Sequence, residues 1–165
     1  MTRVGGGARL ALVAVLALSA AACGASASPS AASSGSSLPP VVRAVLAAGN
    51  PAAATDQNLE LVRYTIQPGT TLALHRHPGM QLAWIESGVL TYTVEVGKVT
   101  VHRVDGSTID VRPGDTVRIV AGEWLAETGS VVHFGANEGP DVVVILAASL
   151  LQTGQSPAIP MPSPS

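Results

Sequence analysis

Residues 69–88, GTTLALHRHPGMQLAWIESG, contain two histidines one residue apart, followed by a Pro-Gly pair and a second apolar stretch. In a β-strand successive side chains point to opposite faces, so His75 and His77 share one face while Leu74 and Arg76 take the other. The two imidazoles then lie about 7 Å apart along the strand, a spacing at which both can reach one ion. The stretch therefore predicts a strand that carries part of a metal site.

The next strand follows a turn signal, because the Pro78-Gly79 pair allows the chain to double back. Gln81 begins this strand, and Ala83 lies on the same side of it. Glu86 falls on the opposite side. This alternation predicts that Gln81, and not the nearby Glu86, faces the histidines.

The rest of the chain shows short apolar alternations separated by Gly and Pro. They predict strands at 59–66, 72–77, 82–86, 90–96, 99–104, 108–111, 116–120, 130–134 and 142–147. Residues 90–96 are expected to pair with 99–104 across the two-residue turn Gly97-Lys98, and residues 97–111 to form an additional hairpin. Residues 38–50, LPPVVRAVLAAGN, have helical spacing before a Gly-Asn stop and predict a short N-terminal helix. The overall pattern favours an all-β antiparallel sandwich or barrel.

The composition limits the classes of partner. Without the two arginines at positions 3 and 9, seven basic side chains remain against eleven acidic ones, a formal charge of −4. The sequence after them contains no basic cluster, so the electrostatic signature of a nucleic-acid-binding protein is missing. The chain has two Trp, two Tyr and one Phe, so its core must consist mainly of Val, Leu and Ile. A small molecule is the expected partner.

The N-terminal residues 1–23 have the pattern of a bacterial signal peptide. Two arginines precede the apolar run 10–18, which is too short for a transmembrane helix of about 20 residues. The motif LSAAAC resembles the lipobox of bacterial lipoproteins, although Ala20 stands where Leu is usual. Cys23, the one cysteine of the chain, is therefore the predicted lipidation site, which would anchor the protein to the cell membrane. The alternative is cleavage after residues 25–27 and release as a secreted protein.

Composition also predicts the domain boundaries. Residues 24–37, GASASPSAASSGSS, are typical of a flexible linker because they offer little apolar area to bury. Residues 38–152 have the length of one domain. The Pro/Ser-rich residues 153–165 are expected to form an irregular tail.

The histidine stretch resembles the first sequence motif of the cupin superfamily. Gly69, His75, His77, position 81 and Gly88 stand at the intervals of that motif. The one departure is Gln81, because the family usually has Glu at this position. The chain is in this respect similar to a small, single-domain cupin.

The second cupin motif is matched more loosely. His133 and Asn137 fit its end, whereas Gly129 lies one residue too far from the histidine and Glu127-Thr128 replaces the expected proline. The resemblance covers roughly residues 59–147 and implies an antiparallel jelly-roll barrel. In the family the residue at the Asn137 position is usually structural.

The resemblance implies that His75, His77, Gln81 and His133 hold one divalent transition metal inside a mouth of the barrel. Three neutral imidazoles and an amide oxygen would leave the metal charge of +2 uncompensated. Such a site favours Lewis-acid chemistry, and zinc, nickel, copper or iron over manganese. Gln is the fourth ligand in some cupins, but loss of the usual Glu also fits a site that no longer holds metal, and both interpretations stay open.

The sequence offers one candidate for acid-base catalysis. Glu127, in the segment GEWLAETG before His133, is the only acidic residue expected close to the mouth, and Trp124 of the same segment is a candidate substrate contact. The chain is then either a metal-dependent enzyme of dioxygenase, isomerase or cyclase type, or a non-catalytic ligand-binding or structural barrel. Both would act outside the cytoplasm. A homodimer is an expectation by analogy with the family.

Overall fold

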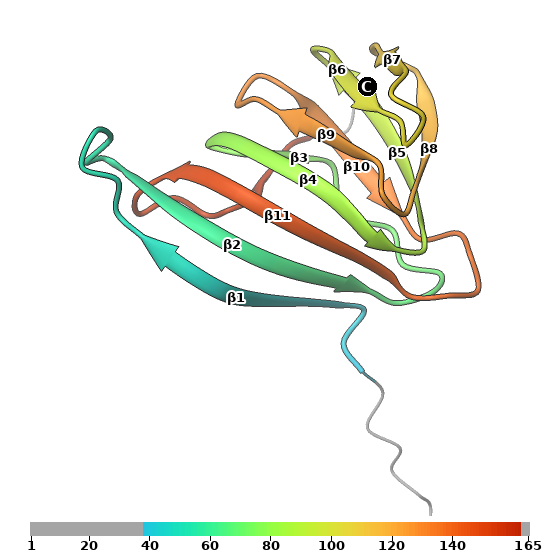
Figure 1. The fold of residues 1–165 in the computed structure, drawn as a ribbon, viewed down its shortest axis with the longest axis horizontal. Coiled ribbons are helices and arrows are strands. Elements are labelled where there is room, and N and C mark those ends of the chain that lie inside the picture. The colour runs from blue at the N-terminus through green and yellow to red at the C-terminus, as the bar shows by residue number, and fades with distance from the viewer. Residues whose placement is uncertain (1–37, 163–165) are drawn as a thin grey trace, which may run out of the picture. The chain divides into compact units, whose positions relative to one another are not determined.

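The computed structural model describes residues 38–162, and within this range all regular secondary structure is β (Figure 1). The strands are β1 (Val41–Gly49), β2 (Gln57–Ile66), β3 (His75–Arg76), β4 (Gly79–Ser87), β5 (Val89–Val96), β6 (Val99–His102), β7 (Thr108–Val111), β8 (Thr116–Val120), β9 (Trp124–Glu127), β10 (Val132–Ala136), β11 (Val143–Gln152) and β12 (Ile159–Pro160). All of their pairings are antiparallel. The predicted all-β antiparallel class is confirmed.

The strands form two sheets that enclose one core. The larger sheet has the order β1-β2-β11-β4-β9-β6-β7, and the smaller has the order β12-β3-β10-β5-β8. Strands that follow each other in the chain, such as β3 and β4 or β4 and β5, belong to different sheets, as in a jelly-roll barrel. Figure 1 shows β1, β2, β11 and β4 side by side in the larger sheet.

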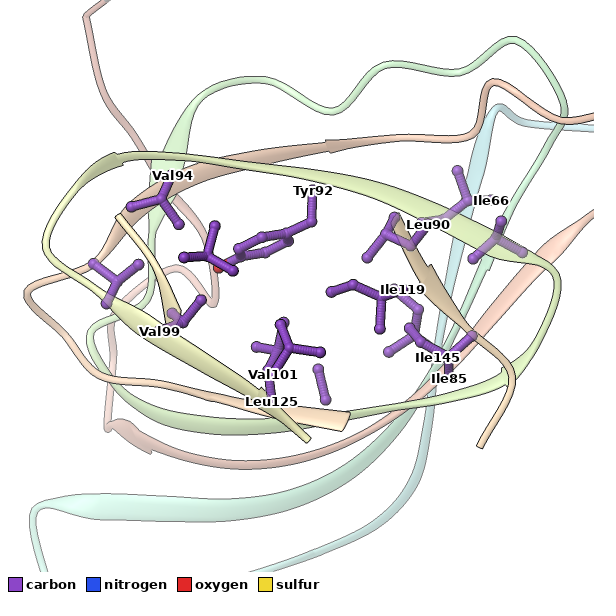
Figure 2. Close-up of a cluster of buried hydrophobic side chains, with 14 residues drawn as sticks. Ile66, Ile85, Leu90, Tyr92, Val94, Val99, Val101, Ile119, Leu125 and Ile145 are labelled. Carbon is purple, nitrogen blue, oxygen red and sulfur yellow. The ribbon is translucent and has the colours of Figure 1, made fainter. Parts of the chain in front are cut away.

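The core consists of the inward-facing side chains of both sheets (Figure 2). On β4, Gln81, Ala83 and Ile85 are buried, whereas Leu82 and Trp84 are exposed. This confirms the predicted alternation of the strand. Most of the buried side chains are Val, Ile and Leu, whose branched shapes pack well on a pleated surface.

The N-terminal helix predicted over residues 38–50 is wrong, because residues 41–49 form the edge strand β1. β1 pairs with β2 along its whole length, from Val41 opposite Ile66 to Gly49 opposite Leu59, with a bulge after Val45. A helix of this length is marginal in water, whereas pairing with β2 satisfies backbone groups along the strand. Tertiary pairing therefore overrides the local helical spacing.

The predicted hairpin between 90–96 and 99–104 is also wrong. β5 pairs with β8 and β10 in the smaller sheet, whereas β6 pairs with β7 and β9 in the larger one. The turn at Gly97, which has a φ of 86°, carries the chain from one sheet to the other. The additional hairpin expected over residues 97–111 is confirmed, since β6 and β7 pair from Val99 opposite Val111 onward.

The tail was expected to be irregular, but part of it is ordered against the barrel. Ile159 and Pro160 of β12 pair with Arg76 and His75 of β3. This pairing places the segment at the end of the barrel where the histidines lie. The predicted signal peptide, Cys23 and the linker 24–37 lie outside the described residues. Over residues 38–162 no helix has the length and hydropathy needed to cross a membrane.

Candidate metal centre

The predicted site residues come together from strands of both sheets. His75 lies on β3 directly opposite His133 on β10, in the smaller sheet. Gln81 on β4 lies directly opposite Glu127 on β9, in the larger sheet. His77 lies in the short connection between β3 and β4. Two cross-strand pairs and this connection therefore bring five polar side chains to one end of the barrel.

Three histidines form the centre of the site. One ring nitrogen from each of His75, His77 and His133 lies within 4.8 Å of the others. His77 and His133 are buried, and His75 is partly exposed. Neutral imidazoles in such a cluster are the ligands preferred by zinc, copper, iron and nickel.

Backbone carbonyls orient two of the three rings. The Nδ1 atom of His75 lies 2.7 Å from the carbonyl oxygen of Ala73, and that of His77 lies 2.6 Å from the carbonyl oxygen of Pro157. A carbonyl only accepts hydrogen bonds, so each Nδ1 carries a hydrogen, and when the ring is neutral Nε2 has the lone pair that a metal requires. Metal-binding histidines are commonly oriented in this way.

Only one nitrogen of the third ring has a polar partner in the described part of the chain. His133 Nε2 lies 3.0 Å from Glu127 Oε1, whereas its Nδ1 is buried and has no partner among the described residues. Buried polar atoms without partners are uncommon in folded proteins. The imidazole is thus incompletely satisfied by the protein alone, which fits a site that takes up a further ligand.

Glu127 supplies a carboxylate to the cluster. Its Oε1 accepts a hydrogen bond of 2.9 Å from the Tyr92 hydroxyl, and its Oε2 accepts one of 2.9 Å from Gln81 Nε2. Oε2 also lies 3.2 Å from His77 Nε2. With the Oε1 contact to His133, four side chains surround this buried carboxyl group.

The environment keeps Glu127 ionised. Burial opposes ionisation, but the charge of His133, together with the hydrogen bond and charge of His77, holds the pKa of Glu127 at about 2. Burial lowers the pKa of His133 to about 4, although Glu127 acts in the opposite direction. Burial also raises the pKa of Tyr92, so its hydroxyl keeps its proton. At neutral pH the cluster therefore offers a carboxylate and a neutral His133, as metal binding requires. Burial lowers the pKa of His77, but the hydrogen bond and charge of Glu127 raise it overall, so a metal would compete with a proton for that ring.

Hydrogen bonds turn the amide oxygen of Gln81 away from the histidines. Gln81 Oε1 accepts a hydrogen bond of 2.8 Å from Ser149 Oγ, while Nε2 faces both Glu127 and, at 3.1 Å, His77 Nε2. The opposite orientation of the amide would place its oxygen against the Glu127 carboxylate, so the network selects this one. The carboxylate nearest the histidines is therefore that of Glu127 on the neighbouring strand, and the amide oxygen of Gln81 points away from them.

Sequence reasoning missed two members of this network, Tyr92 and Ser149. Both occupy inward positions of their strands, β5 and β11, and are buried among aliphatic residues. A polar residue on the apolar face of an alternating run is the signal that would have found them. Trp124, the candidate substrate contact, lies instead on the outer face of β9, where it stacks on His102 at a centroid distance of 3.7 Å. Asn137 is structural, since its buried amide donates to the carbonyl oxygens of Ile66 and Asp141.

A cavity of about 260 Å³ adjoins the cluster. The three histidines, Gln81 and Glu127 contribute to its wall. Most of the remaining wall is aliphatic, with Ile66, Ile85, Leu90, Leu125 and Ile145 among its residues. Ligand pockets commonly have this composition, in which a few polar groups face a largely apolar space.

A jelly-roll barrel that contains three converging histidines and a carboxylate beside a cavity defines a class of small β-barrel proteins with the ligands for a metal ion. The description "Cupin domain" applies to the family model that matches residues 62–148, more than half of the chain. The chain belongs to this cupin family, which confirms the resemblance seen in the sequence motifs.

Solved structures similar to this chain include an oxalate decarboxylase and a cupin 2 domain-containing protein. Bacillus subtilis oxalate decarboxylase, studied for its Mn(II) centres, is 20% identical with a TM-score of 0.43, and the match covers 73% of this chain and 27% of that one. A cupin 2 domain-containing protein from Halorhodospira halophila is 12% identical with a TM-score of 0.49, covering 74% and 71%. The chain thus spans about a quarter of the oxalate decarboxylase length. No curated protein matches the sequence.

Proposed function

We propose that this cupin binds one divalent metal ion through His75, His77, His133 and Glu127, and acts on a small organic molecule in the adjoining cavity. The cluster of three imidazoles, two of which contact one buried carboxylate, carries the proposal. The two Glu127 oxygens lie 3.0 Å from His133 Nε2 and 3.2 Å from His77 Nε2. Neighbouring ligands of an octahedral ion with bonds of about 2.1 Å are separated by about 3.0 Å, so the Glu127 oxygens already lie at a ligand-like distance from His77 and His133.

Gln81 in this proposal positions Glu127 and is not itself the oxygen ligand. Its amide nitrogen donates to Glu127, and Ser149 holds its oxygen on the other side. The alternative that the site has decayed through loss of the usual Glu loses its main support, because a carboxylate is present one strand away.

The donor set also bears on the choice of metal. Three imidazoles suit zinc, nickel, copper and iron, as the sequence predicts. The carboxylate neutralises one unit of the metal charge, so the reason for disfavouring manganese no longer applies. Elemental analysis of the purified protein would identify the ion.

A bound metal would act as a Lewis acid and polarise a substrate oxygen. The residues of the cavity wall would hold the substrate in place and exclude water from it. Glu127, the predicted acid or base, is ill suited to proton transfer because its pKa is about 2 and four side chains contact it. Glu127 is the one carboxyl group among the described residues of the wall, which favours chemistry at the metal, by dioxygenation or an isomerase or cyclase step. The same observation supports a ligand-binding module as the second candidate. Oxygen uptake and product analysis with bound ligand separate the three outcomes, since a binding module releases its ligand unchanged.

Metal content tests the proposed site. Protein purified without a histidine tag should contain one metal ion per chain, and Glu127→Gln and His77→Ala should each remove it. Glu123→Gln is the matched control, because Glu123 is equally buried but pairs with Arg103 away from the cluster. A wild-type protein without stoichiometric metal, or a Glu127→Gln protein that keeps its metal after dialysis, would contradict the proposal.

We further propose that the protein acts outside the cytoplasm, anchored by lipid at Cys23. The N-terminal sequence pattern and the single cysteine support this location. Cys23→Ser should move the protein from the membrane fraction to the soluble fraction. Membrane association that persists in this variant would instead exclude the lipid anchor, whereas wild-type protein found only in the culture medium would favour secretion.

A further inference from the structure

The cavity beside the metal cluster changes from polar to apolar along the strands that line it. On β4 the inward side chains are, in order, Gln81, Ala83 and Ile85. The neighbouring strands show the same change, each with a polar residue toward the cluster and an apolar residue farther along. These are Ser149 and then Ile145 on β11, Tyr92 and then Leu90 on β5, and Glu127 and then Leu125 on β9. At about 3.3 Å per residue, the four steps from Gln81 to Ile85 span about 13 Å. The space therefore extends lengthwise from a polar end to an aliphatic end.

The aliphatic end contains no carboxyl group or side-chain nitrogen among the described wall residues, although the hydroxyl of Tyr64, which also lines the cavity, accepts a hydrogen bond from Arg43. Figure 2 shows Leu90, Ile66, Ile85 and Ile145 gathered at one side of the interior, away from Val94 and Val99. Among the described residues that form the cavity wall, the charged or protonatable nitrogen and carboxyl groups all belong to the metal cluster. A ligand must therefore place any charged group at the cluster and an uncharged, apolar part at the other end.

The charge of the cluster limits the charge of the ligand's head group. A divalent ion with the Glu127 carboxylate carries a net charge of +1, since the histidine ligands are neutral when they bind metal. One monoanionic head group would bring the buried site to neutrality. A second anionic group would lie in the aliphatic part without a partner, where burying an unpaired charge is costly.

The volume limits the size of the ligand. An aliphatic cavity of about 150 Å³ binds benzene, which has six non-hydrogen atoms. On the same scale the 260 Å³ cavity takes a molecule of about ten non-hydrogen atoms. A straight-chain carboxylate of eight carbons has this size and fits within the length of the cavity.

We propose that the ligand of this site is an elongated apolar molecule of about ten non-hydrogen atoms, with a single oxygen-containing head group that is neutral or carries one negative charge. The inference rests on the proposed metal site, since the head group binds at the metal and the apolar part fills the space between Leu90, Leu125 and Ile145. Dicarboxylates long enough to place their second carboxylate in the aliphatic part are disfavoured by the same reasoning.

A homologous series of straight-chain carboxylates, from acetate to dodecanoate, tests the inference by calorimetric titration of the full-length, metal-loaded protein. Affinity should rise about fourfold with each added methylene up to about octanoate, and then level off or fall once the cavity is full. Suberate, the eight-carbon dicarboxylate, should bind at least about 100-fold more weakly than octanoate. Affinity that is independent of chain length, or equal affinity for suberate and octanoate, would overturn the inference.

Two neighbouring substitutions locate the binding. Ala83→Leu adds three carbons to the cavity wall and should shift the best chain length to a shorter carboxylate, whereas Trp84→Ala changes the exposed outer face and should leave it unchanged. A shift with Trp84→Ala alone would mean that the chains bind outside the barrel, against the inference. If Ala83→Leu fails to fold, the wild-type series with Trp84→Ala still decides the question.

Metal analysis of the same samples separates this inference from the proposed function. Wild-type protein that holds no metal contradicts the proposed function itself. Protein that holds one metal ion but shows no dependence on chain length contradicts only the ligand class.

Discussion

Exchange of Gln81 and Glu127 is the sharpest test of where the carboxylate of this site belongs. Glu127→Gln removes the one negative charge of the cluster and leaves its shape nearly unchanged. Two unit charges about 4 Å apart at an effective dielectric constant of about 20 attract each other by about 4 kcal/mol, and a divalent ion at ligand distance is attracted more strongly. Since about 1.4 kcal/mol is a tenfold change, metal affinity should fall by at least about three orders of magnitude.

The double variant Gln81→Glu/Glu127→Gln should recover most of this loss. The two positions are direct cross-strand partners, so the carboxylate returns to the cluster from β4. The hydrogen bonds can also be remade, because the new glutamine can accept from Tyr92 and donate to position 81, and Ser149 can donate to the new carboxylate. We expect the metal affinity of the double variant to lie within about tenfold of the wild type. The effects of the two substitutions are then strongly non-additive, as expected for residues in direct contact.

The assay is competition between the protein and a chelator of known affinity, with metal content measured after dialysis. All four proteins, the wild type, the two single variants and the exchange variant, should have similar far-ultraviolet circular dichroism. The reasoning is refuted if Glu127→Gln keeps wild-type affinity, or if the exchange variant binds no better than Glu127→Gln alone.

Three further predictions concern the surroundings of the site and the fold. A chain that ends at residue 155 lacks the Pro157 carbonyl that orients His77, so its metal affinity should fall about 10- to 100-fold in the chelator assay, whereas a chain that ends at residue 162 should match the wild type. Tyr92→Phe removes a hydrogen-bond donor from the buried Glu127 carboxylate. It should lower the free energy of unfolding of the metal-free protein, measured by urea denaturation, by about 1–3 kcal/mol. An unchanged midpoint of the urea transition would show that this hydrogen bond contributes nothing. Gly88→Ala should lower the free energy of unfolding by about 3 kcal/mol, because Gly88 has a positive φ of 78° and its added Cβ would lie 2.7 Å from the Val142 carbonyl oxygen. Gly69→Ala should lower it by about 1 kcal/mol, because Gly69 has a similar φ of 74° but open space around it. Equal shifts of the melting temperature would disprove the contribution of the close contact.

The features that depend on local alternation were predictable from the sequence. Alternation placed Gln81 on the buried face of its strand and Leu82 and Trp84 on the exposed face, as observed. The motif spacing singled out His75, His77 and His133, which the fold brings within 4.8 Å of one another. These predictions succeeded because the period of two in a strand is a property of the backbone.

The features that depend on distant pairing were not predictable in the same way. Residues 41–49 resemble a short helix until β2 is available as a partner, and residues 99–102 resemble the return strand of a hairpin until β9 pairs with them. The tail residues 157–160 gave no sign that one of their carbonyls would orient His77. In each case a partner far away in the sequence decides the structure.

The carboxylate of the cluster shows why a motif can misplace a functional group. A motif compares residues by their spacing along one strand, and by that measure the acidic ligand expected at position 81 is missing. An ion, in contrast, responds to where the atoms lie, and strands paired in a sheet are only about 4.8 Å apart. Glu127 is 46 residues from Gln81 in the chain, yet their side chains are hydrogen-bonded at 2.9 Å. A side chain on the strand opposite position 81 can reach the same histidines. A change from Glu to Gln at position 81 therefore removes the negative charge from the site only if the opposite strand supplies no carboxylate.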